Sequence, residues 1–588
     1  MLSGDALVGF TSAEYAGLPT FGAPGTDFPT ATSGYIVPDG GTAGSGEDNG
    51  TTMGYYPAAN TVYWFAPGTH YFPSGQMLAG TGAVLVGGPG AVVNGGGING
   101  TAGGVIVEYL TVQDLSGTTS GSGQGFVNNS LEPNWTIEHD TIEDGSNAGV
   151  NVGSNDTVEY DCIYNNGEAG VVGYGGYDDT ISYNEVSGND PSQVDYPGSP
   201  VQCGCGGGIK MLESTDVTIS GNYVHGNGDP GLWLDTDNAG TTITDNYISD
   251  NYSEGIFYET SYDGLIENNT LVDNSWGGGG VGGTTYGNVT GAIYVSESGS
   301  PPAGYTVTPW CAMTGACPPD TQVTCAGSTA CQSTFVITQN TFVNNWGGVI
   351  IYEDSGRNSA YCPSGSPSPG DCPSSDPSAL SDSLLNGHGG TLVGPASSIV
   401  SSGDPWGAIA CYNAQDAGPG GSPDYADLCQ WLASNVSVTD NVFSINPATI
   451  NANLASGEPQ CTVADKCGFA GLFAFDAGGT YQPSGCPGGG NAAYQCEDSA
   501  SVNISYDQGN VLSDNEYYGP WQFWDFSQSN LANPVSWSTW ARGGKRGGAS
   551  RVRCSDRNIG RCAVPFGQDR GSSLLPNGGP WWGFGSGA

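Results

Sequence analysis

The chain has very few cationic side chains for its length. Lysine and arginine number 11 against 57 aspartate and glutamate residues in 588, so the formal net charge is −46 at pH 7. Nucleic acids and anionic membrane surfaces repel a protein of this charge. The charge balance therefore argues against nucleic-acid binding and membrane insertion, and it suits an extracellular setting or a bound cation.

Long apolar segments are also missing. No run is long enough to cross a bilayer, and no signal-peptide pattern follows Met1. Charged residues make up only 12% of the chain, but 14 tryptophans, 30 tyrosines and 17 phenylalanines are available for burial, which excludes a disordered protein. With 99 glycines, the composition is typical of many short strands joined by tight turns.

Zinc-binding spacings are absent from the 17 cysteines. No Cys-x-x-Cys occurs with a matching second half or a nearby histidine. The cysteines instead form locally spaced pairs, which predicts disulfides inside loops and an oxidising compartment, although the connectivity cannot be read from the spacing. The pairs are Cys311/Cys317, Cys325/Cys331, Cys362/Cys372, Cys411/Cys429, Cys461/Cys467 and Cys486/Cys496.

A repeat becomes visible when segments are aligned on one asparagine or aspartate. In all eight segments the residue three positions before it and the residue two positions after it are apolar. An asparagine at the bend of each turn would stack on its copies and so satisfy amide groups that burial would leave unpaired. The shared positions are Asp140, Asp161, Asn184, Asn222, Asn246, Asn269, Asn340 and Asn441.

Uninterrupted copies recur every 21 to 24 residues. A βαβ unit needs about 30 residues or more, and the alternation of apolar and polar residues within each segment indicates a strand. A second strand follows each asparagine with the same period, beginning for example at Gly208, Gly231 and Gly255. The sequence therefore predicts an all-β solenoid of stacked turns.

Insertions interrupt this repeat near 187–205, 276–331, 354–433 and 447–500, and they contain nearly all the cysteines. In a solenoid such insertions are loops that often crowd one binding face. We expect an N-terminal cap over 1–60, the solenoid over 61–525, and a C-terminal cap with a flexible basic tail over 526–588. The basic residues after position 541 are Arg542, Lys545, Arg546, Arg551, Arg553, Arg557, Arg561 and Arg570.

The repeated segments "NYVH", "NYIS" and "NTLV" and the pair "GLWLDTDN" and "GIFYETS" resemble the right-handed parallel β-helix superfamily, which contains pectate lyases, polyuronate epimerases and several glycoside hydrolases. The resemblance covers about residues 60–525. It implies a single-stranded right-handed parallel β-helix with long disulfide-bearing loop insertions, in a secreted carbohydrate-active protein. Because one fold hosts many chemistries, the repeated turns leave the reaction open.

The second strands place two carboxyl groups at one position on consecutive turns. Ile209, Leu232 and Ile256 lie on the face that we expect to form the core, whereas Asp235 and Glu259 lie on the face that we expect to meet solvent. Neighbouring strands lie about 4.8 Å apart, so the two carboxyl groups are expected roughly 5 Å from each other. That spacing is typical of retaining glycosidases, with their pair at about 5–5.5 Å, and one of the two pKa values should rise.

Residues beside this pair are candidates to hold a sugar. Trp233 and Phe257 flank the carboxyl groups and offer aromatic faces for stacking, and Asp237 lies two residues beyond the first carboxyl group. Lys210 lies one turn away and is a third catalytic candidate. A glycosidase built in this way needs no metal or cofactor.

A second interpretation treats the acidic residues as a calcium site, because clusters of oxygen ligands suit Ca²⁺. Its ligands would be Asp235, Asp237 and Glu259. The resemblance implies a base for this case as well, since β-helix lyases combine bound Ca²⁺ with a lysine or arginine base, and Lys210 would take that role.

Three hypotheses follow for the function. The first is a secreted glycoside hydrolase that acts on a polysaccharide through Asp235 and Glu259. The second is a Ca²⁺-dependent polysaccharide lyase or epimerase. The third is a non-catalytic surface adhesin or structural solenoid. In each case the expected partner is a polysaccharide or another glycan, and the sequence leaves the oligomeric state open.

Overall fold

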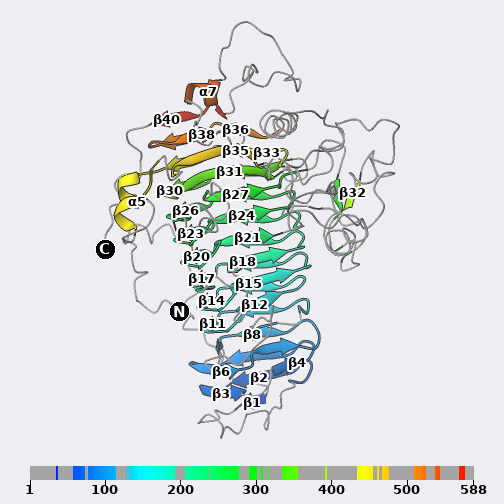
Figure 1. The fold of residues 1–588 in the computed structure, drawn as a ribbon. Helices are drawn as coiled ribbons and strands as arrows, with labels where there is room; N and C mark the ends of the chain where they lie inside the picture. Colours follow the sequence, from blue (N-terminus) through cyan, green and yellow to red (C-terminus); the bar gives the residue numbers. More distant parts are fainter. Residues whose placement is uncertain are drawn as a thin grey trace, which may run out of the picture.

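The computed structural model of the chain is a tall stack of short parallel strands (Figure 1). Within the described residues only two α-helices occur, α5 (Pro447–Asn453) and α7 (Trp537–Arg542). None of the described helices has the length and apolar character needed to span a membrane. The structure describes residues 35–37, 57–65, 67–72, 77–113, 127–128, 131–191, 206–235, 238–276, 291–300, 306–308, 311, 317, 323, 334–354, 391–393, 433–454, 460–462, 467–475, 509–524, 537–542 and 569–575.

Three parallel sheets form the walls of the stack, and a turn of the central part contributes one strand to each sheet. Sheet A contains β1 (Tyr35–Val37), β2 (Val62–Phe65), β5 (Val84–Gly87), β8 (Ile106–Glu108), β10 (Thr136–Glu138), β13 (Thr157–Glu159), β16 (Thr180–Ser182), β19 (Thr218–Ser220), β22 (Thr242–Thr244), β25 (Leu265–Glu267), β29 (Phe335–Thr338), β33 (Val436–Thr439), β36 (Val511–Ser513) and β39 (Asp569–Arg570). Sheet B contains β3 (Gly68–Phe72), β6 (Ala91–Gly95), β9 (Thr111–Gln113), β11 (Thr141–Glu143), β14 (Cys162–Tyr164), β17 (Glu185–Ser187), β20 (Tyr223–His225), β23 (Tyr247–Ser249), β26 (Thr270–Val272), β30 (Thr341–Val343), β34 (Val442–Ser444), β37 (Glu516–Tyr518) and β40 (Ser573–Leu575).

Sheet C contains β12 (Val150–Val152), β15 (Ala169–Tyr174), β18 (Gly207–Leu212), β21 (Leu232–Asp235), β24 (Ile256–Glu259), β27 (Ile293–Ser296), β31 (Gly347–Asp354), β35 (Phe469–Phe475) and β38 (Gln522–Trp524). A parallel pair, β4 (Met77–Ala79) and β7 (Ile98–Gly100), continues this wall toward the N-terminus through single bridges at Val127. The predicted all-β solenoid is confirmed.

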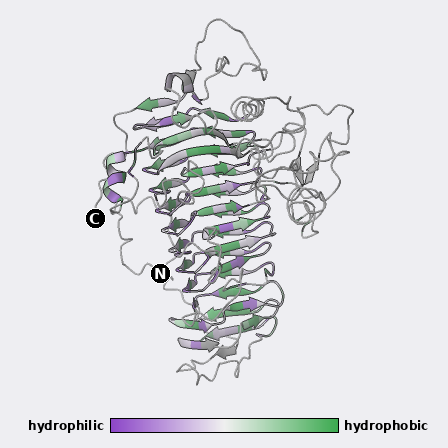
Figure 2. Ribbon diagram, viewed as in Figure 1, coloured by the Kyte–Doolittle hydropathy of each residue, from purple (hydrophilic) through white to green (hydrophobic). Residues whose placement is uncertain are grey.

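Apolar columns fill the interior of the stack. All sixteen apolar positions that flank the repeated asparagine or aspartate are at most 1% exposed. They pair with their copies in register, as Ile219 does with Ile243 in sheet A and Val224 with Ile248 in sheet B. Figure 2 shows apolar residues recurring along the strands of successive turns. Burial is therefore shared among stacked turns, as expected for a repeat protein.

The repeated asparagines form the predicted ladder at the bend between sheets A and B. The backbone N–H and the Nδ2 of Asn222 both donate to Oδ1 of Asn246, at 2.9 and 3.0 Å. The same Nδ2 donates to the carbonyl oxygen of Ile181 at 2.9 Å. Each buried amide thus finds partners on the turns on either side of it, which removes the cost of burying it.

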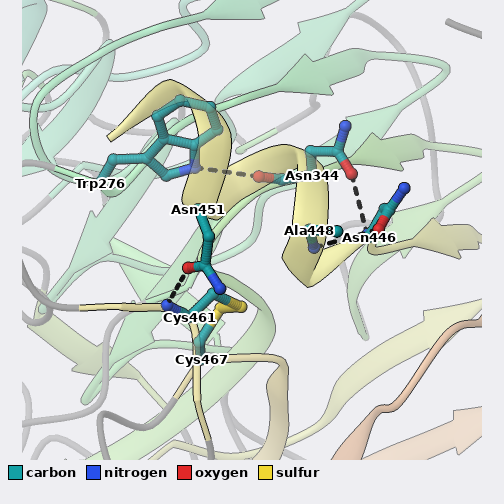
Figure 3. Close-up of a disulfide and its surroundings, with 7 residues drawn as sticks. All are labelled: Trp276, Asn344, Asn446, Ala448, Asn451, Cys461 and Cys467. Carbon is teal, nitrogen blue, oxygen red and sulfur yellow. Dashed lines mark hydrogen bonds between the residues drawn. A yellow bond between two sulfur atoms is a disulfide. The ribbon is translucent and has the colours of Figure 1, made fainter. Parts of the chain in front are cut away.

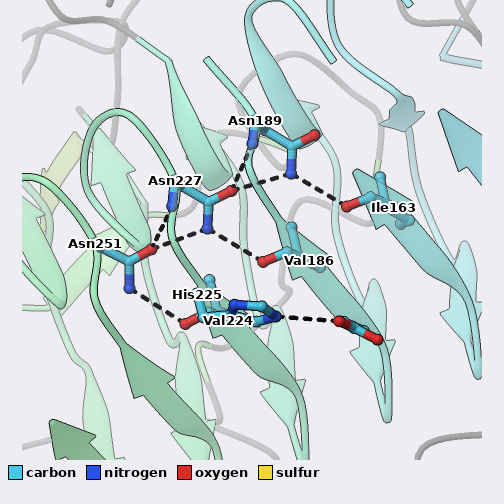
Figure 4. Close-up of polar contacts among 8 residues, drawn as sticks. Ile163, Val186, Asn189, Val224, His225, Asn227 and Asn251 are labelled. Atoms are coloured by element: carbon cyan, nitrogen blue, oxygen red, sulfur yellow. Dashed lines mark hydrogen bonds and ion pairs between the residues drawn. The ribbon is translucent and has the colours of Figure 1, made fainter. Parts of the chain in front are cut away.

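A second asparagine ladder, beyond the predicted one, lies at the bend between sheets B and C (Figure 4). There Nδ2 of Asn227 donates to Oδ1 of Asn251 at 2.9 Å and to the carbonyl oxygen of Val186 at 3.1 Å. Every member follows a member of the first ladder by five positions. The members are Asn166, Asn189, Asn227, Asn251, Asn274 and Asn345.

Aspartates take the place of asparagine in the first ladder where it begins. Oδ1 of Asp161 accepts the backbone N–H of Asp140, and Oδ1 of Asn184 accepts that of Asp161. The Oδ2 atoms of both aspartates are buried without a hydrogen-bond partner among the described residues. Burial raises the pKa of Asp140 and of Asp161 well above the usual value, and the charge of Asp140 adds to the shift at Asp161.

The stack extends beyond both limits predicted for the solenoid. Strand β1, inside the expected N-terminal cap, pairs with β2, and β39 and β40 pair with β36 and β37. Paired strands thus also occur within the segments expected to be the N-terminal cap and the C-terminal cap and tail. The last turn escaped the alignment because Ser572, and not an asparagine, stands at the ladder position, where its Oγ accepts the backbone N–H of Asn515 at 2.6 Å.

A buried carboxyl group closes the C-terminal end of the stack. Asp569 pairs in register with Leu512, so it stands at a core position, and it is fully buried. Its oxygens accept from Nδ2 of Asn515 at 3.1 Å and from Nε1 of Trp540 at 2.9 Å. Trp540 belongs to α7 and stacks on Phe523, with ring centroids 5.4 Å apart. Helix α7 therefore covers the last turn.

Two of the predicted local disulfides are present, Cys311–Cys317 and Cys461–Cys467. The second lies beside α5, where Oδ1 of Asn451 accepts the backbone N–H of Cys461 at 2.5 Å (Figure 3). An antiparallel pair, β28 (Thr306–Thr308) and β32 (Thr391–Val393), joins two of the insertions. The other predicted cysteine pairs lie outside the described residues.

Candidate active site on sheet C

Strands β18, β21 and β24 carry the candidate residues at two outward positions of sheet C. The first outward position holds Lys210, Trp233 and Phe257 on consecutive turns, in register. The second outward position lies two residues further along each strand and holds Leu212, Asp235 and Glu259. Asp235 and Glu259 are thus direct neighbours on adjacent parallel strands.

The outward face of these strands is more covered than the alternation of residues predicted. Lys210, Trp233 and Glu259 are buried, and Glu259 keeps only 4% of its surface exposed. The side chain of Asp235 remains 18% exposed. The expectation that all these side chains face solvent was therefore wrong, because side chains at the two outward positions cover one another. Asp235 is the carboxyl group of the pair that solvent reaches more readily.

Each carboxyl group is held by a donor from the preceding turn. Nζ of Lys210 lies 3.1 Å from Oδ2 of Asp235, and Nε1 of Trp233 donates to Oε2 of Glu259 at 3.0 Å. Both contacts have the same geometry. In each, a side chain at the first outward position of one strand reaches a carboxyl group at the second outward position of the next strand. Charge-assisted contacts of this kind fix the direction of a carboxyl group.

The indole of Trp233 has neighbours on both of its faces. Nζ of Lys210 lies 3.7 Å from the ring centroid, and the ring of Phe257 is stacked at 5.3 Å and 21°. These neighbours come from the strands on opposite sides of β21, so they cover opposite faces. Both faces of the Trp233 ring are therefore in contact with neighbouring side chains. Phe257 is partly exposed and contacts Tyr294 at 5.3 Å on its other side.

An exposed aromatic residue that the sequence did not single out lies in line with the acidic pair. Tyr174 is 48% exposed and pairs in register with Leu212, which pairs with Asp235. It therefore stands at the second outward position, two strands from Asp235, or about 10 Å at the usual strand spacing. Its place at the end of "GVVGY" is the only signal in the sequence.

Further buried carboxyl groups lie near Lys210, at the opposite end of the strands from Asp235. Burial raises the pKa of Asp229 to about 8, and the nearby charges of Asp190 and Glu254 add to the shift, while Lys210 opposes it. This part of the site therefore carries protons at neutral pH that an exposed carboxyl group would release. Lys210 thus interacts with Asp235 on one side along the strand direction and with Asp229 on the other.

Two of the three residues proposed for the alternative calcium site, Asp235 and Glu259, lie in the described part of the chain. An ammonium group already lies 3.1 Å from Oδ2 of Asp235 and competes with any cation there. Asp237, the third expected ligand, lies outside the described residues. Among the residues that are described, no group of three or more histidine, cysteine, aspartate or glutamate side chains is arranged to hold a metal ion.

Residues 126–308 match a family model described as right handed beta helix region. This segment contains β18, β21 and β24, and its strands stack into three parallel sheets. The chain is a right-handed parallel β-helix protein. No curated protein matches this β-helix protein.

Three solved structures similar to this β-helix protein are 14 to 16% identical to it. XylC in complex with xylose has a TM-score of 0.24, with 35% of this chain and 43% of XylC covered. The A-module of the mannuronan C-5 epimerase AlgE4 of Azotobacter vinelandii has a TM-score of 0.32, with 50% and 83% covered. The catalytic domain of GH87 α-1,3-glucanase in complex with nigerose has a TM-score of 0.34, with 57% and 60% covered. The chain thus spans less than half of XylC.

Proposed function

We propose that this β-helix protein is an extracellular glycoside hydrolase that cleaves a polysaccharide, with Asp235 and Glu259 as its catalytic pair. The observation that carries the proposal is their register, since the two residues are direct neighbours on adjacent parallel strands. A spacing of about 4.8 Å between strands places such a pair near the 5–5.5 Å of retaining glycosidases. The disulfides at Cys311–Cys317 and Cys461–Cys467 support an extracellular setting.

In this mechanism Asp235 is the nucleophile, because it is the more exposed carboxyl group and is paired with Lys210. Its carboxylate attacks the anomeric carbon while Glu259 gives a proton to the leaving oxygen, so the glycosidic bond breaks and a glycosyl ester forms on Asp235. Glu259, now ionised, takes a proton from water, and the resulting hydroxide displaces the sugar from Asp235. Both carboxyl groups return to their starting states.

Three variants test the proposal on a panel of polysaccharides, with and without chelator. Asp235→Asn should abolish turnover, because an amide cannot form the glycosyl ester. Glu259→Gln should lower the rate by about 10²–10⁴ and should affect substrates with poor leaving groups more than activated aryl glycosides. Glu267→Gln is the matched control, since Glu267 stands on the outer side of sheet A in the next turn and should keep full activity. Full activity in both Asp235→Asn and Glu259→Gln would refute the assignment of these two residues as the catalytic pair.

The lyase or epimerase hypothesis predicts a different pattern in the same experiment. Lys210→Ala would then be the most damaging change, and added Ca²⁺ would be required. The contact between Lys210 and Asp235 favours the hydrolase, because an ammonium in an ion pair has no electron pair with which to take a proton. A wild-type protein that binds glycans but turns over none would point to the third hypothesis, a non-catalytic adhesin or structural solenoid.

A further inference from the structure

We propose that Trp233 is a positioning residue that aims the carboxyl group of Glu259, and not a platform for the sugar. This inference rests on the proposed function of Asp235 and Glu259. Tryptophan has a single hydrogen-bond donor, Nε1–H. In Trp233 that donor is directed at Oε2 of Glu259, 3.0 Å away and on the next turn. The bond therefore determines which oxygen of Glu259 is turned toward the indole.

The ring that carries this donor is itself fixed on both sides. Lys210 lies over one face at 3.7 Å, and Phe257 is stacked on the other at 5.3 Å. Trp233 is buried as well, so it has little freedom to change its rotamer. A rigid ring with one aimed donor can hold a catalytic group within the narrow tolerance that catalysis requires.

The same ring links the two halves of the site. Lys210 contacts Asp235 through its charge and Trp233 through the ring face, and Trp233 contacts Glu259 through its N–H. A continuous chain of contacts thus runs from Asp235 through Lys210 and Trp233 to Glu259. Removing the N–H at Trp233 breaks this chain at one bond and leaves the stacked rings in place.

Trp233→Phe is therefore the decisive variant, because phenylalanine keeps an aromatic ring and removes only the donor and the second ring of the indole. We expect kcat to fall about ten- to a hundredfold, the size of one hydrogen bond to a charged group, while KM changes less than about twofold. The basic limb of the kcat profile should move to higher pH, because the lost donor favours the carboxylate over the acid. In a Glu259→Gln background the same change should have little further effect.

Trp276→Phe is the matched control. Nε1 of Trp276 also donates to an oxygen at 3.0 Å, but that oxygen is the backbone carbonyl of Asn344, beside α5 (Figure 3). This variant should leave kcat and its pH profile unchanged.

A readout without substrate separates the two proposals. The indole N–H resonance that disappears in Trp233→Phe should titrate with pH in the wild type and lose that titration in Glu259→Gln. The positioning role of Trp233 is overturned if this resonance does not shift with pH, or if the Trp233→Phe protein has the kcat and pH profile of the wild type. Neither result bears on the proposed function of Asp235 and Glu259. A wild type that turns over no glycan overturns the proposed function itself.

Discussion

The backbone N–H of Asp140 donates a hydrogen bond to Oδ1 of Asp161, 2.7 Å away on the next turn of the β-helix. On later turns an asparagine at this position uses Nδ2 to reach a backbone carbonyl and the neighbouring amide. Aspartate can supply such a donor only when it is protonated. The start of the first ladder is therefore complete only while Asp140 and Asp161 hold their protons.

We predict that the turns around these residues become less stable as the pH rises. The pKa values of Asp140 and Asp161 are raised by burial, so the folded state binds protons that the unfolded chain releases above about pH 4. Their contribution is fully present below that pH and is lost as the pH rises toward the folded-state values. Asp156, with a pKa raised to about 7, adds a loss between about pH 4 and 7. Hydrogen exchange of residues 131–191 at pH 4.5 and pH 8 measures the effect, and equal protection at both would contradict it.

Replacing one of these aspartates by asparagine should remove part of that dependence. Asp161→Asn continues the ladder from Asn184 and supplies an Nδ2 donor at every pH, so it should stabilise the protein at pH 8 by about 1–3 kcal/mol. Thermal unfolding at pH 4.5 and pH 8 tests this. Asp440→Asn, a change at an exposed bend, is the control and should leave stability unchanged. A destabilised Asp161→Asn at pH 8 would show that the charged form is the one the ladder needs.

The second ladder should be as sensitive as the first to the loss of one amide. In Asn227→Ala, the acceptor for Asn189 and the donor to Val186 and Asn251 are lost together. Each group left buried without a partner costs about 1–3 kcal/mol, so we expect a destabilisation of roughly 3 kcal/mol or more in urea unfolding. His225→Ala, two positions away on the outer side of sheet B, should cost much less, since its contact to Glu185 is partly exposed.

Tyr174 should contribute to substrate binding more than to the chemical step. Its ring is exposed and stands two strands from Asp235 at the same outward position. Tyr174→Ala is expected to raise KM for a polymer several-fold with little change in kcat, because a contact made equally in the ground and transition states affects binding alone. Tyr183→Ala removes a comparably exposed tyrosine from the bend between sheets A and B and should change neither constant. A large fall in kcat at Tyr174→Ala would place that residue closer to the reacting atoms.

Helix α7 should be required for the stability of the C-terminal turns. Trp540→Ala removes a fully buried side chain from Phe523 and the donor to Asp569, and large-to-small changes of this kind cost about 3–5 kcal/mol. Limited proteolysis should then cleave the variant in β36–β40 before the central turns. A cleavage pattern like that of the wild type would show that the last turn holds without the helix.

The sequence predicted the repeating part of the fold because each turn there is specified by local signals. Ile219, Asn222 and Val224 recur with their spacing intact, and the apolar columns and the first ladder follow from that spacing alone. The second ladder could have been predicted in the same way, since each of its asparagines, such as Asn227, lies five positions after a member of the first ladder, such as Asn222. The last turn was not, because Asp569 and Ser572 replace the residues that mark the other turns.

The candidate site was predicted in its register but not in its environment. The one-turn spacing of Asp235 and Glu259 placed them side by side, since parallel strands repeat in register. The repeat in the sequence does not show how far a long side chain such as that of Lys210 extends toward the neighbouring turn. The diagonal contacts from Lys210 and Trp233, and the burial that follows from them, depend on that tilt and so required the structure.

Asp569 also bears on the C-terminal edge of the described stack. A stack in which every turn offers the same pairing edge to the next has no intrinsic length, and its final edge is a template on which another copy could grow. At this edge the apolar column that runs through Ile337, Val438 and Leu512 stops at a carboxyl group, and α7 lies across it. A carboxyl group at this core position, bonded to Trp540 of α7, offers no apolar surface on which a further turn could pack.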